Sequence, residues 1–492
     1  MGNRYLEGNY APVREERTLT ELPVTGTIPA HLDGRYVRNG PNPLGELDPR
    51  TYHWFSGDGM VHGVRLRDGK AEWYRNRWVR TPAVARALGE PAPRCAPHHA
   101  GLQVIGANTN VLSHAGRTLA LVEGGLASYE LTGELDTGCP CDFDGTIRGG
   151  YTAHPKRDPD TGELHAVSYS FGRGNWVQYS VIGADGRARR MVDVRVTGSP
   201  MMHDFSLTEN HVVFYDLPVT FDPVAGATIT APPGLRAITR LVLSVLVGRI
   251  RIPEPLTAMI GKGMRKNAPL PYKWDPNYPA RVGVMPRTGD AADLRWFDIE
   301  PCYVFHPLNA YDSGAYDSGA YDSGDCIVLD VVRHPKMFDT ERHGPYEGDP
   351  TLDRWIVDLS AGKVRQTCLD DHPQEFPRID ERRAGKAYRY GYSIQVRSGR
   401  FGDSVLKHDV HREQVITRRL GAQRRVGEFV FVPNGPHSPE DDGVLMGFVY
   451  DTGTDRSELM LLDAATLDTV ATVDLPIRVP HGFHGNWIPS SP

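Results

Sequence analysis

Residues 428–450 read Glu-Phe-Val-Phe-Val-Pro-Asn-Gly-Pro-His-Ser-Pro-Glu-Asp-Asp-Gly-Val-Leu-Met-Gly-Phe-Val-Tyr, and this stretch sets the expected fold class. Two runs rich in Val and Phe, 428–432 and 444–450, flank a segment full of Pro, Gly, Asn and Asp. β-Branched and aromatic residues favour strands, whereas the residues between them favour turns. The stretch therefore predicts a hairpin with Asp442-Gly443 in its turn.

The same pattern recurs outward along the chain, where Asp68-Gly69 and Asp185-Gly186 are further turn pairs of the hairpin type. With 52 Gly and 39 Pro in 492 residues, few long helices are expected. Many short strands favour an all-β fold that closes on itself, such as a propeller, although no repeat fixes the number of blades. We predict one domain over residues 1–492, because all-β domains often exceed the usual length. Further strands are expected at 104–105, 118–122, 166–169, 212–215 and 326–332.

Two segments favour helix, an Ala-rich one at 81–88 and one at 233–248 with apolar residues at helical spacing. We expect cap segments at about 81–92 and 230–270. Arginines flank the second helix, and an apolar stripe with basic flanks can enter a membrane interface. The alternative is a cap helix that packs on the body of the protein.

Composition and charge exclude some classes of protein. The chain has 55 basic and 61 acidic residues and a formal net charge of −6, so nucleic-acid binding is not expected. The polar N-terminus and the lack of a run of 18 apolar residues argue against a secretory signal and a transmembrane helix. Six sparse cysteines form no framework and are interpreted as reduced thiols. Together these features predict a cytoplasmic protein.

The pentapeptide Ala-Tyr-Asp-Ser-Gly occurs three times in tandem over residues 310–324. Asp, Ser and Gly form turns, so we expect an extended surface loop before a strand that starts at Cys326. The period of five does not match a calcium-binding loop. We interpret the repeat as an insertion.

Four of the 19 histidines have apolar or aromatic neighbours that suit a buried imidazole. Their separations of 49, 103 and 178 residues exclude a local motif but suit ligands from different blades. Neutral imidazole binds iron, zinc, copper or nickel. Four such ligands leave two positions of an octahedral ion open, whereas zinc more often takes three ligands and water or closes tetrahedrally. The four residues are His154, His203, His306 and His484.

Three glutamates, Glu123, Glu375 and Glu428, lie beside apolar strand residues, where a carboxylate needs a partner. Metal-binding histidines commonly donate their outer N–H to a carboxylate, which gives these residues a role. The alternative is an ordinary Glu–Arg pair, and Arg378 is close to Glu375 in sequence.

An ordered set of segments from Gly34 to Trp487, together with the four histidines, resembles the carotenoid cleavage oxygenase family, which includes apocarotenoid, stilbene and retinoid enzymes. No single segment is specific to this family, but the segments in this order, together with the four histidines, are. The segments are Gly-Arg-Tyr-Val-Arg-Asn-Gly-Pro-Asn-Pro (34–43), His-Trp-Phe-Ser-Gly-Asp-Gly-Met-Val-His (53–62), Tyr-Arg-Asn-Arg-Trp-Val-Arg-Thr (74–81), Ala-Asn-Thr-Asn (107–110), Glu-Phe-Pro-Arg-Ile (375–379), Glu-Asp-Asp-Gly-Val (440–444) and Gly-Phe-His-Gly (482–485).

The resemblance implies a seven-bladed β-propeller with a small α-helical cap over the active-site face. It implies one Fe(II) per chain held by the four histidines, with the three glutamates orienting three of the rings. Thr109 matches a residue whose methyl group shields one open position of the iron. Family members cleave an alkene C=C bond with O2 and form two carbonyl products. Their substrates enter an apolar tunnel from a patch that contacts membrane, and 233–248 falls near that patch.

We therefore expect cleavage of a small hydrophobic polyene, a carotenoid or apocarotenoid. Stilbene-cleaving relatives carry a lysine where this chain has Val122; a lysine would stabilise a phenolate, whereas valine suits a polyene. A lignostilbene-type dioxygenase is the alternative. An isomerising or hydrolysing relative and a non-catalytic propeller are further alternatives. The sequence does not predict the oligomeric state. Candidates for the tunnel lining are Trp54, Phe55, Phe205, Phe305 and Phe483.

Overall fold

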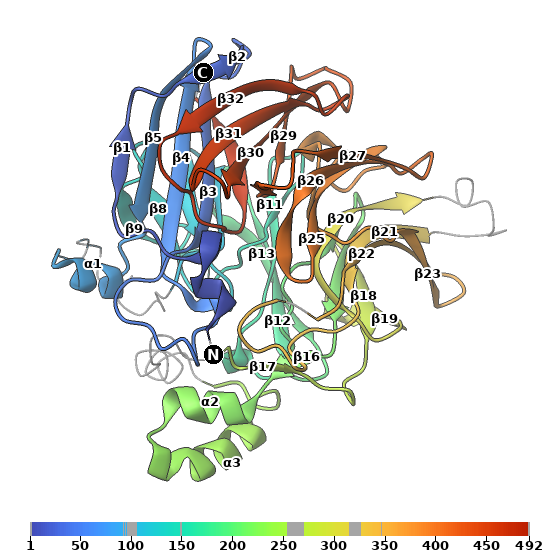
Figure 1. Cartoon of the computed structure of the whole chain (residues 1–492). Helices are drawn as coiled ribbons and strands as arrows, with labels where there is room; N and C mark the ends of the chain where they lie inside the picture. The colour runs from blue at the N-terminus through green and yellow to red at the C-terminus, as the bar shows by residue number, and fades with distance from the viewer. Residues whose placement is uncertain are drawn as a thin grey trace.

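Seven antiparallel sheets surround a common axis in the computed structural model of the chain (Figure 1). Strands at one end of neighbouring sheets contact each other, as β14 does β20 and β20 does β24, so these strands line the axis. The all-β class and the seven blades are confirmed. The structure describes residues 2–91, 93, 95, 106–147, 150–252, 270–313, 326–345 and 347–490.

Each blade is given from its strand nearest the axis outward. Blade 1 contains β33 (Gly485–Pro489), β3 (Gly34–Pro41), β4 (Gly59–Arg67), β5 (Lys70–Trp78) and β1 (Arg17–Leu19). Blade 2 contains β6 (Asn110–His114), β7 (Arg117–Leu121), β8 (Ser128–Leu131) and β9 (Thr137–Cys141). Blade 3 contains β10 (Lys156–Arg157), β11 (Leu164–Ser168), β12 (Trp176–Ile182) and β13 (Ala188–Arg195). Blade 4 contains β14 (Ser206–Leu207), β15 (His211–Asp216), β18 (Arg281–Pro286) and β19 (Arg295–Asp298).

Blade 5 contains β20 (Tyr303–Ser313), β21 (Cys326–His334), β22 (Thr351–Asp358) and β23 (Lys363–Asp370). Blade 6 contains β24 (Gln374–Ile379), β25 (Tyr390–Arg397), β26 (Arg400–Asp409) and β27 (Gln414–Arg419). In blade 7, β28 (Arg424–Val426) and β29 (Val430–Pro433) both pair with β30 (Gly443–Asp451), which is followed by β31 (Arg456–Asp463), β32 (Thr469–Leu475) and β2 (Val24–Gly26). A separate two-stranded sheet pairs β16 (Val219–Phe221) with β17 (Tyr272–Trp274).

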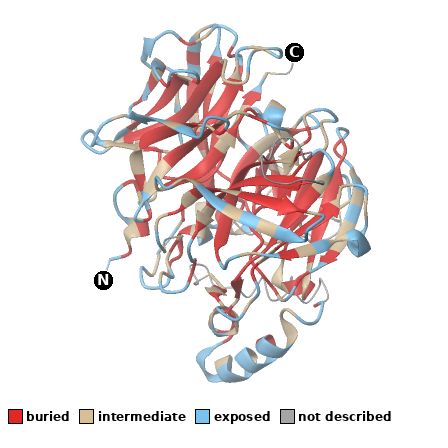
Figure 2. Ribbon diagram, turned by 90° about the vertical axis from the view of Figure 1, so that its right-hand side faces the viewer, coloured by how far each residue is buried: buried red, intermediate tan, exposed pale blue. Residues whose placement is uncertain are grey.

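Both ends of the chain close the ring. The C-terminal strand β33 pairs with β3, and the N-terminal strand β2 pairs with β32. Blades 1 and 7 are therefore each built from both ends of the sequence. The strands of the blades are mostly buried, whereas the helix over Arg236–Leu246 is mostly exposed (Figure 2).

The predicted hairpins and strands are found where the described residues test them. Asp68 and Gly69 have φ values of 50° and 70° in the turn between β4 and β5, a left-handed conformation that Asp and Gly tolerate. The hairpin quoted first is β29–β30, but its first strand starts at Val430 rather than at Glu428. The strand expected at 104–105 lies outside the described residues.

The described residues contain three α-helices, two of them together at the lower end of the view and one at the side of blade 1 (Figure 1). Helix α1 (Pro82–Leu88) starts after the cap residue Thr81, and α3 (Arg236–Leu246) follows the short 3-10 helix η6 (Pro233–Leu235), so both predicted helices are confirmed. Helix α2 (Pro223–Thr230) was not predicted, because its eight residues carry no amphipathic pattern. Residues 253–269 of the expected cap lie outside the described part, and a single domain over 1–492 stays a prediction. Further 3-10 helices are η1 (Arg4–Leu6), η2 (Gly8–Tyr10), η3 (Trp54–Ser56), η5 (Phe171–Arg173), η7 (Ala291–Asp293) and η8 (Glu381–Arg383).

Two expectations need correction. Residues 310–313 of the repeat belong to strand β20, where Ser313 pairs with Cys326, so the loop is shorter than expected. Pairing with β21 outweighs the turn preference of Asp and Ser there, and residues 314–324 are not described. Cys95 and Cys139 form a disulfide with their Cα atoms 5.6 Å apart, which corrects the expectation that all thiols are reduced. The two cysteines meet because of the path that the chain takes after α1. The spacing of the cysteines in the sequence does not reveal that path.

Disulfides are rare in reducing compartments, so the cytoplasmic location stays a prediction. No helix within the described ranges is long and apolar enough to cross a bilayer.

Candidate metal centre

The four predicted histidines meet at the axis of the propeller. One ring nitrogen from each lies within 4.8 Å of the others, and all four side chains are buried. The centroids of the His154 and His203 rings are 4.4 Å apart, and those of His306 and His484 are 4.6 Å apart. Residues separated by up to 330 positions in the sequence therefore form one compact cluster.

Each blade contributes one residue to the centre or to its carboxylate partners. His154, His203 and His484 lie just before β10, β14 and β33, and His306 lies in β20. Glu123, Glu375 and Glu428 come from blades 2, 6 and 7.

The sheet register is broken where the site residues of blades 5 to 7 lie. In β20 the register shifts between Val304 and Pro307, and in β24 it shifts between Glu375 and Arg378. Glu428 lies in the interruption between β28 and β29. A bulge turns a side chain that would otherwise follow the alternation of its strand. Pro307 and Pro377 mark two of these breaks, because proline cannot donate to a ladder.

Three of the histidines hold their outer nitrogen against a carboxylate. A carboxylate accepts the Nδ1–H, so the tautomer leaves the Nε2 lone pair directed into the cluster. The pairs are His203 with Glu123 at 2.9 Å, His306 with Glu375 at 2.7 Å and His484 with Glu428 at 2.9 Å.

The inner nitrogens fit a bound cation. Nε2 of His203 and Nε2 of His306 are 3.2 Å apart, although each has its proton on the other nitrogen. Nε2 of His154 is buried without a hydrogen-bond partner among the described residues, with Glu123 Oε1 at 3.1 Å. Lone pairs that face each other repel unless a positive charge lies between them, so this donor set suits a borderline divalent metal.

Burial and the carboxylates set the protonation of the rings. Burial lowers the pKa of His154 well below its usual value and lowers that of His306, although Glu375 opposes the second shift. Burial also acts on His203, but the carboxylate of Glu123 outweighs it and raises the pKa. The pKa of Glu375 is lowered because its contacts with His306 and His334 outweigh burial. Glu375 is thus held as a charged acceptor.

Aromatic rings cover one side of the histidines. The Phe305 ring lies 4.9 Å from His203, and Phe376 stacks on His306 at 5.6 Å. Phe55 contacts both Phe305 and Phe483, at 6.0 and 5.3 Å. Trp54 lies 4.6 Å from Phe483 and completes the group. Four of the five lining candidates are thus brought together.

Phe205 lies apart from that group, under the Lys156 ammonium at 5.6 Å, so it is not placed as expected. Phe376 was missed, although it lies next to Glu375 in a segment already singled out. His481, three residues before His484, is buried and stacks on Phe401 with ring centroids 4.3 Å apart.

Two further partners of the carboxylates were not predicted. Tyr169 donates its hydroxyl to Glu123 at 2.8 Å, and His334 lies 3.0 Å from Glu375. Each is more than 40 residues from its glutamate, and no local motif marks either one.

Thr109 lies beside the centre, where its carbonyl accepts the backbone N–H of His484 at 3.1 Å. Its hydroxyl donates to Asn108 at 3.0 Å, so the polar end of the side chain is already engaged. The shielding role of its methyl group stays a prediction.

Comparison with known proteins gives the family. The family model of the Retinal pigment epithelial membrane protein matches residues 10–489. A protein of Mycobacterium tuberculosis named carotenoid cleavage oxygenase is 57% identical over 498 residues, which cover 99% of this chain and 98% of the relative. The chain belongs to the carotenoid cleavage oxygenase family. A Crocus sativus member named carotenoid 9,10(9',10')-cleavage dioxygenase is 31% identical and covers 98% of this chain and 89% of its own.

Solved structures agree with the family's fold. The crystal structure of Pseudomonas brassicacearum lignostilbene dioxygenase matches with a TM-score of 0.79 and 25% identity, over 99% of this chain and 98% of that chain. The family therefore includes oxygenases that are named for unlike substrates, and family membership alone does not choose among them.

Proposed function

We propose that this chain is an Fe(II)-dependent dioxygenase that cleaves a C=C bond of a carotenoid or apocarotenoid with O2 and forms two carbonyl products. The observation that carries the proposal is the convergence of four Nε2 lone pairs, three of them fixed by carboxylates. Four neutral imidazoles suit iron and leave two positions of an octahedral ion open. When bound, Fe(II) would supply the activation of dioxygen for the cleavage.

The residues of the chain would orient the substrate and exclude water. His154, His203, His306 and His484 would hold the ion, and Glu123, Glu375 and Glu428 would keep three rings in the required tautomer. Phe305 and Phe376 offer the apolar surface against which a polyene packs. Thr109 would shield one open position with its methyl group.

Two observations favour a polyene over a stilbene. Val122 is buried next to Glu123, and an aliphatic side chain there offers nothing to a phenol. The relative at 57% identity is named for carotenoid cleavage. The lignostilbene dioxygenase likeness at 25% identity keeps a stilbene as the second candidate.

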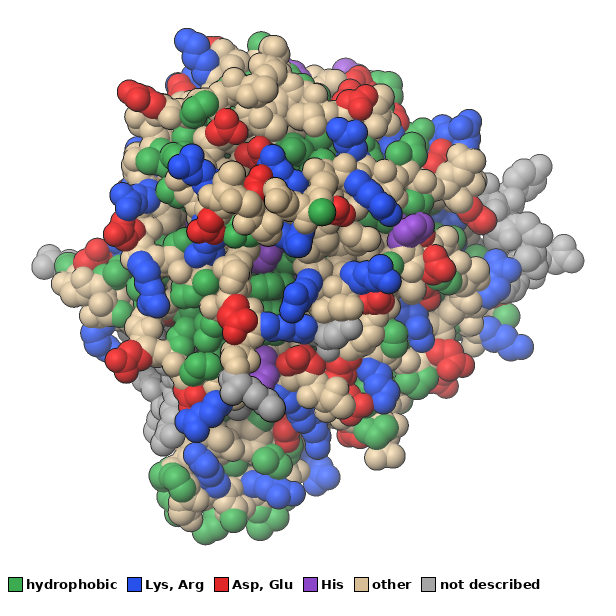
Figure 3. All heavy atoms as spheres, in the orientation of Figure 1, with side chains coloured by type: hydrophobic (Ala, Val, Ile, Leu, Met, Phe, Trp, Pro, Cys, Tyr) green, Lys and Arg blue, Asp and Glu red, His purple; other side chains and the backbone are tan. Residues whose placement is uncertain are grey.

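We further propose peripheral contact with a membrane through 233–248. In α3, Ile238 and Leu241 are 63% and 67% exposed, and Val242 and Val245 follow on the same face. Hydrophobic and basic side chains gather at this end of the molecule (Figure 3). An apolar face with arginines beside it suits an interface between lipid and water.

The test is incubation of the iron-loaded protein with apocarotenals, carotenes and hydroxystilbenes under 18O2, with products identified by mass. Labelled carbonyl products from a polyene would support the proposal. Turnover of stilbenes alone would favour the second candidate. Products formed without O2 would contradict both the polyene-cleaving and the stilbene-cleaving dioxygenase.

A further inference from the structure

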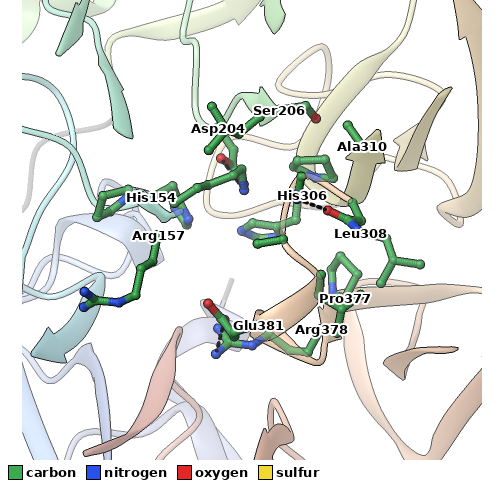
Figure 4. A pocket seen from close by; sticks show the side chains of 18 of the residues that line it. His154, Arg157, Asp204, Ser206, His306, Leu308, Ala310, Pro377, Arg378 and Glu381 are labelled. Atoms are coloured by element: carbon green, nitrogen blue, oxygen red, sulfur yellow. Dashed lines mark hydrogen bonds and ion pairs between the residues drawn. The ribbon is translucent and has the colours of Figure 1, made fainter. Parts of the chain in front are cut away.

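A polar cavity of about 110 Å³ adjoins the histidines away from the aromatic rings. Its wall includes His154, His306 and His484, but not Phe305 or Phe376. The histidines therefore border two unlike environments, an aromatic one and a polar one. Figure 4 shows the labelled side chains around this cavity, with Asp204 and Glu381 on opposite sides of the view.

The cavity joins the buried centre to the protein surface. The side chain of His154 is 7% exposed, whereas the Glu381 side chain, which also lines the cavity, is 56% exposed. Glu381 begins η8, and Ala384 directly follows η8 at the same rim. A small hydrated ion at the rim thus has a polar route to the imidazoles.

The charges that line this route are balanced. Lys156 pairs with Asp204 at 3.1 Å, and Arg378 lies 3.2 Å from Glu381 and 3.6 Å from Glu428. Arg157 donates to the backbone carbonyls of Ser113 and Gly162. Three carboxylates therefore face three bases, and each carboxylate can replace a water of a passing cation.

The aromatic rings on the other side of the histidines offer no ligand that could replace the water around a metal ion. Phe55, Phe305 and Phe483 contact one another there, and moving a divalent ion out of water carries a large desolvation penalty unless ligands compensate. The carboxylates of Asp204, Glu381 and Glu428 in the polar cavity supply such ligands.

We propose that this cavity is the passage through which a divalent metal ion enters and leaves the four-histidine site. The inference rests on the metal site of the proposed function and not on the reaction or its substrate. It leaves the aromatic side free for the polyene.

The test follows uptake and release of Co(II) by the metal-free protein. Imidazole binds Co(II), and its visible absorption reports binding directly. Ala384→Trp should narrow the rim, and Glu381→Lys should make the balanced lining positive. Both should slow uptake and chelator-driven release about tenfold, a barrier higher by about 1.4 kcal/mol. The final stoichiometry should stay at one Co(II) per chain.

The control is Arg383→Trp, since Arg383 is exposed in η8 but does not line the cavity. It should change neither rate by more than about twofold, a barrier change of less than 1 kcal/mol. If Ala384→Trp does not fold, the rates of Glu381→Lys test the proposal alone. The Glu381 side chain is exposed, so its replacement should not prevent folding. The slowing by Glu381→Lys should shrink at high salt.

Wild-type rates in both Ala384→Trp and Glu381→Lys would overturn the passage. Faster release with normal uptake would also overturn it, because a passage changes both rates by the same factor. Failure of the wild-type protein to bind Co(II) would instead overturn the metal site itself, and the proposed function with it.

Discussion

Three of the four imidazoles in the centre are held in one tautomer by a neighbouring carboxylate. Glu375 accepts from His306 at 2.7 Å while His334 lies 3.0 Å from its second oxygen. A carboxylate held from two sides cannot rotate away from the ring it orients. The proposed metal site therefore extends beyond the four rings to groups that would not touch an ion.

Replacing His203 with Ala should abolish stoichiometric iron, because it removes one of four donors and leaves Glu123 without its ring. The measurement is metal content after anaerobic reconstitution. His437→Ala is the matched control, since His437 is exposed and belongs to neither group of candidate metal ligands among the described residues. A His203→Ala protein with full iron and normal turnover would refute the assignment.

Replacing Glu375 with Gln should weaken metal binding about 10- to 100-fold, the usual cost of losing the partner of a ligand. The amide loses the charge and presents a donor to one of two histidines. Competition with a chelator measures the affinity, and the exposed Glu300→Gln is the control. Unchanged affinity would mean that Glu375 has no role in holding the ring.

The sequence was sufficient to predict the four histidines and their three carboxylates, because each lies in a recognisable segment. Tyr169 and His334 could not be predicted, since their contacts exist only after blades pack together. Phe205 shows the opposite failure, because an aromatic residue two positions after His203 was taken for the lining and instead lies under Lys156.

Strand breaks rather than regular strands position the site. Three of the breaks occur in blades 5, 6 and 7, at His306, Glu375 and Glu428. The runs of β-branched and aromatic residues predicted the strands themselves, but they placed Glu428 inside β29 instead of before it. A bulge depends on the partner strand, so the pattern of one strand cannot reveal it.

Helix α3 is expected to carry the membrane contact. Leu241→Glu should lower binding to vesicles of phosphatidylcholine and phosphatidylserine about tenfold, because burial of one leucine is worth about 1.5–3 kcal/mol. Co-sedimentation measures the bound fraction. Ser244→Glu adds the same charge away from the centre of the exposed apolar face and serves as the control. Equal loss in both variants would point to charge alone.

The propeller as a whole buries histidines that are neutral when folded. Burial lowers the pKa values of His53 and His165 to about 3. The unfolded chain, with a histidine pKa of about 6.5, binds more protons between these values. Their contribution to stability is therefore complete above about pH 6.5 and is lost as the pH falls toward 3.

The free energy of unfolding of the metal-free protein, measured by denaturant titration, should accordingly fall from pH 7 to pH 5, by up to about 1.4 kcal/mol per pH unit for each such group. His165→Asn should make this slope shallower by up to one proton. A stability that does not change over this range would contradict the assignment of neutral buried rings.

The pairing of β33 with β3 has a consequence for biosynthesis. His484 is the last of the four histidines in the sequence, and the strand that follows it pairs with Gly34–Arg38, which are synthesised long before it. A ribosome that has not yet reached residue 484 has made only three of the four histidines. The cluster therefore assembles late in translation, and a nascent chain interrupted before His484 has no complete set of imidazoles for a metal ion.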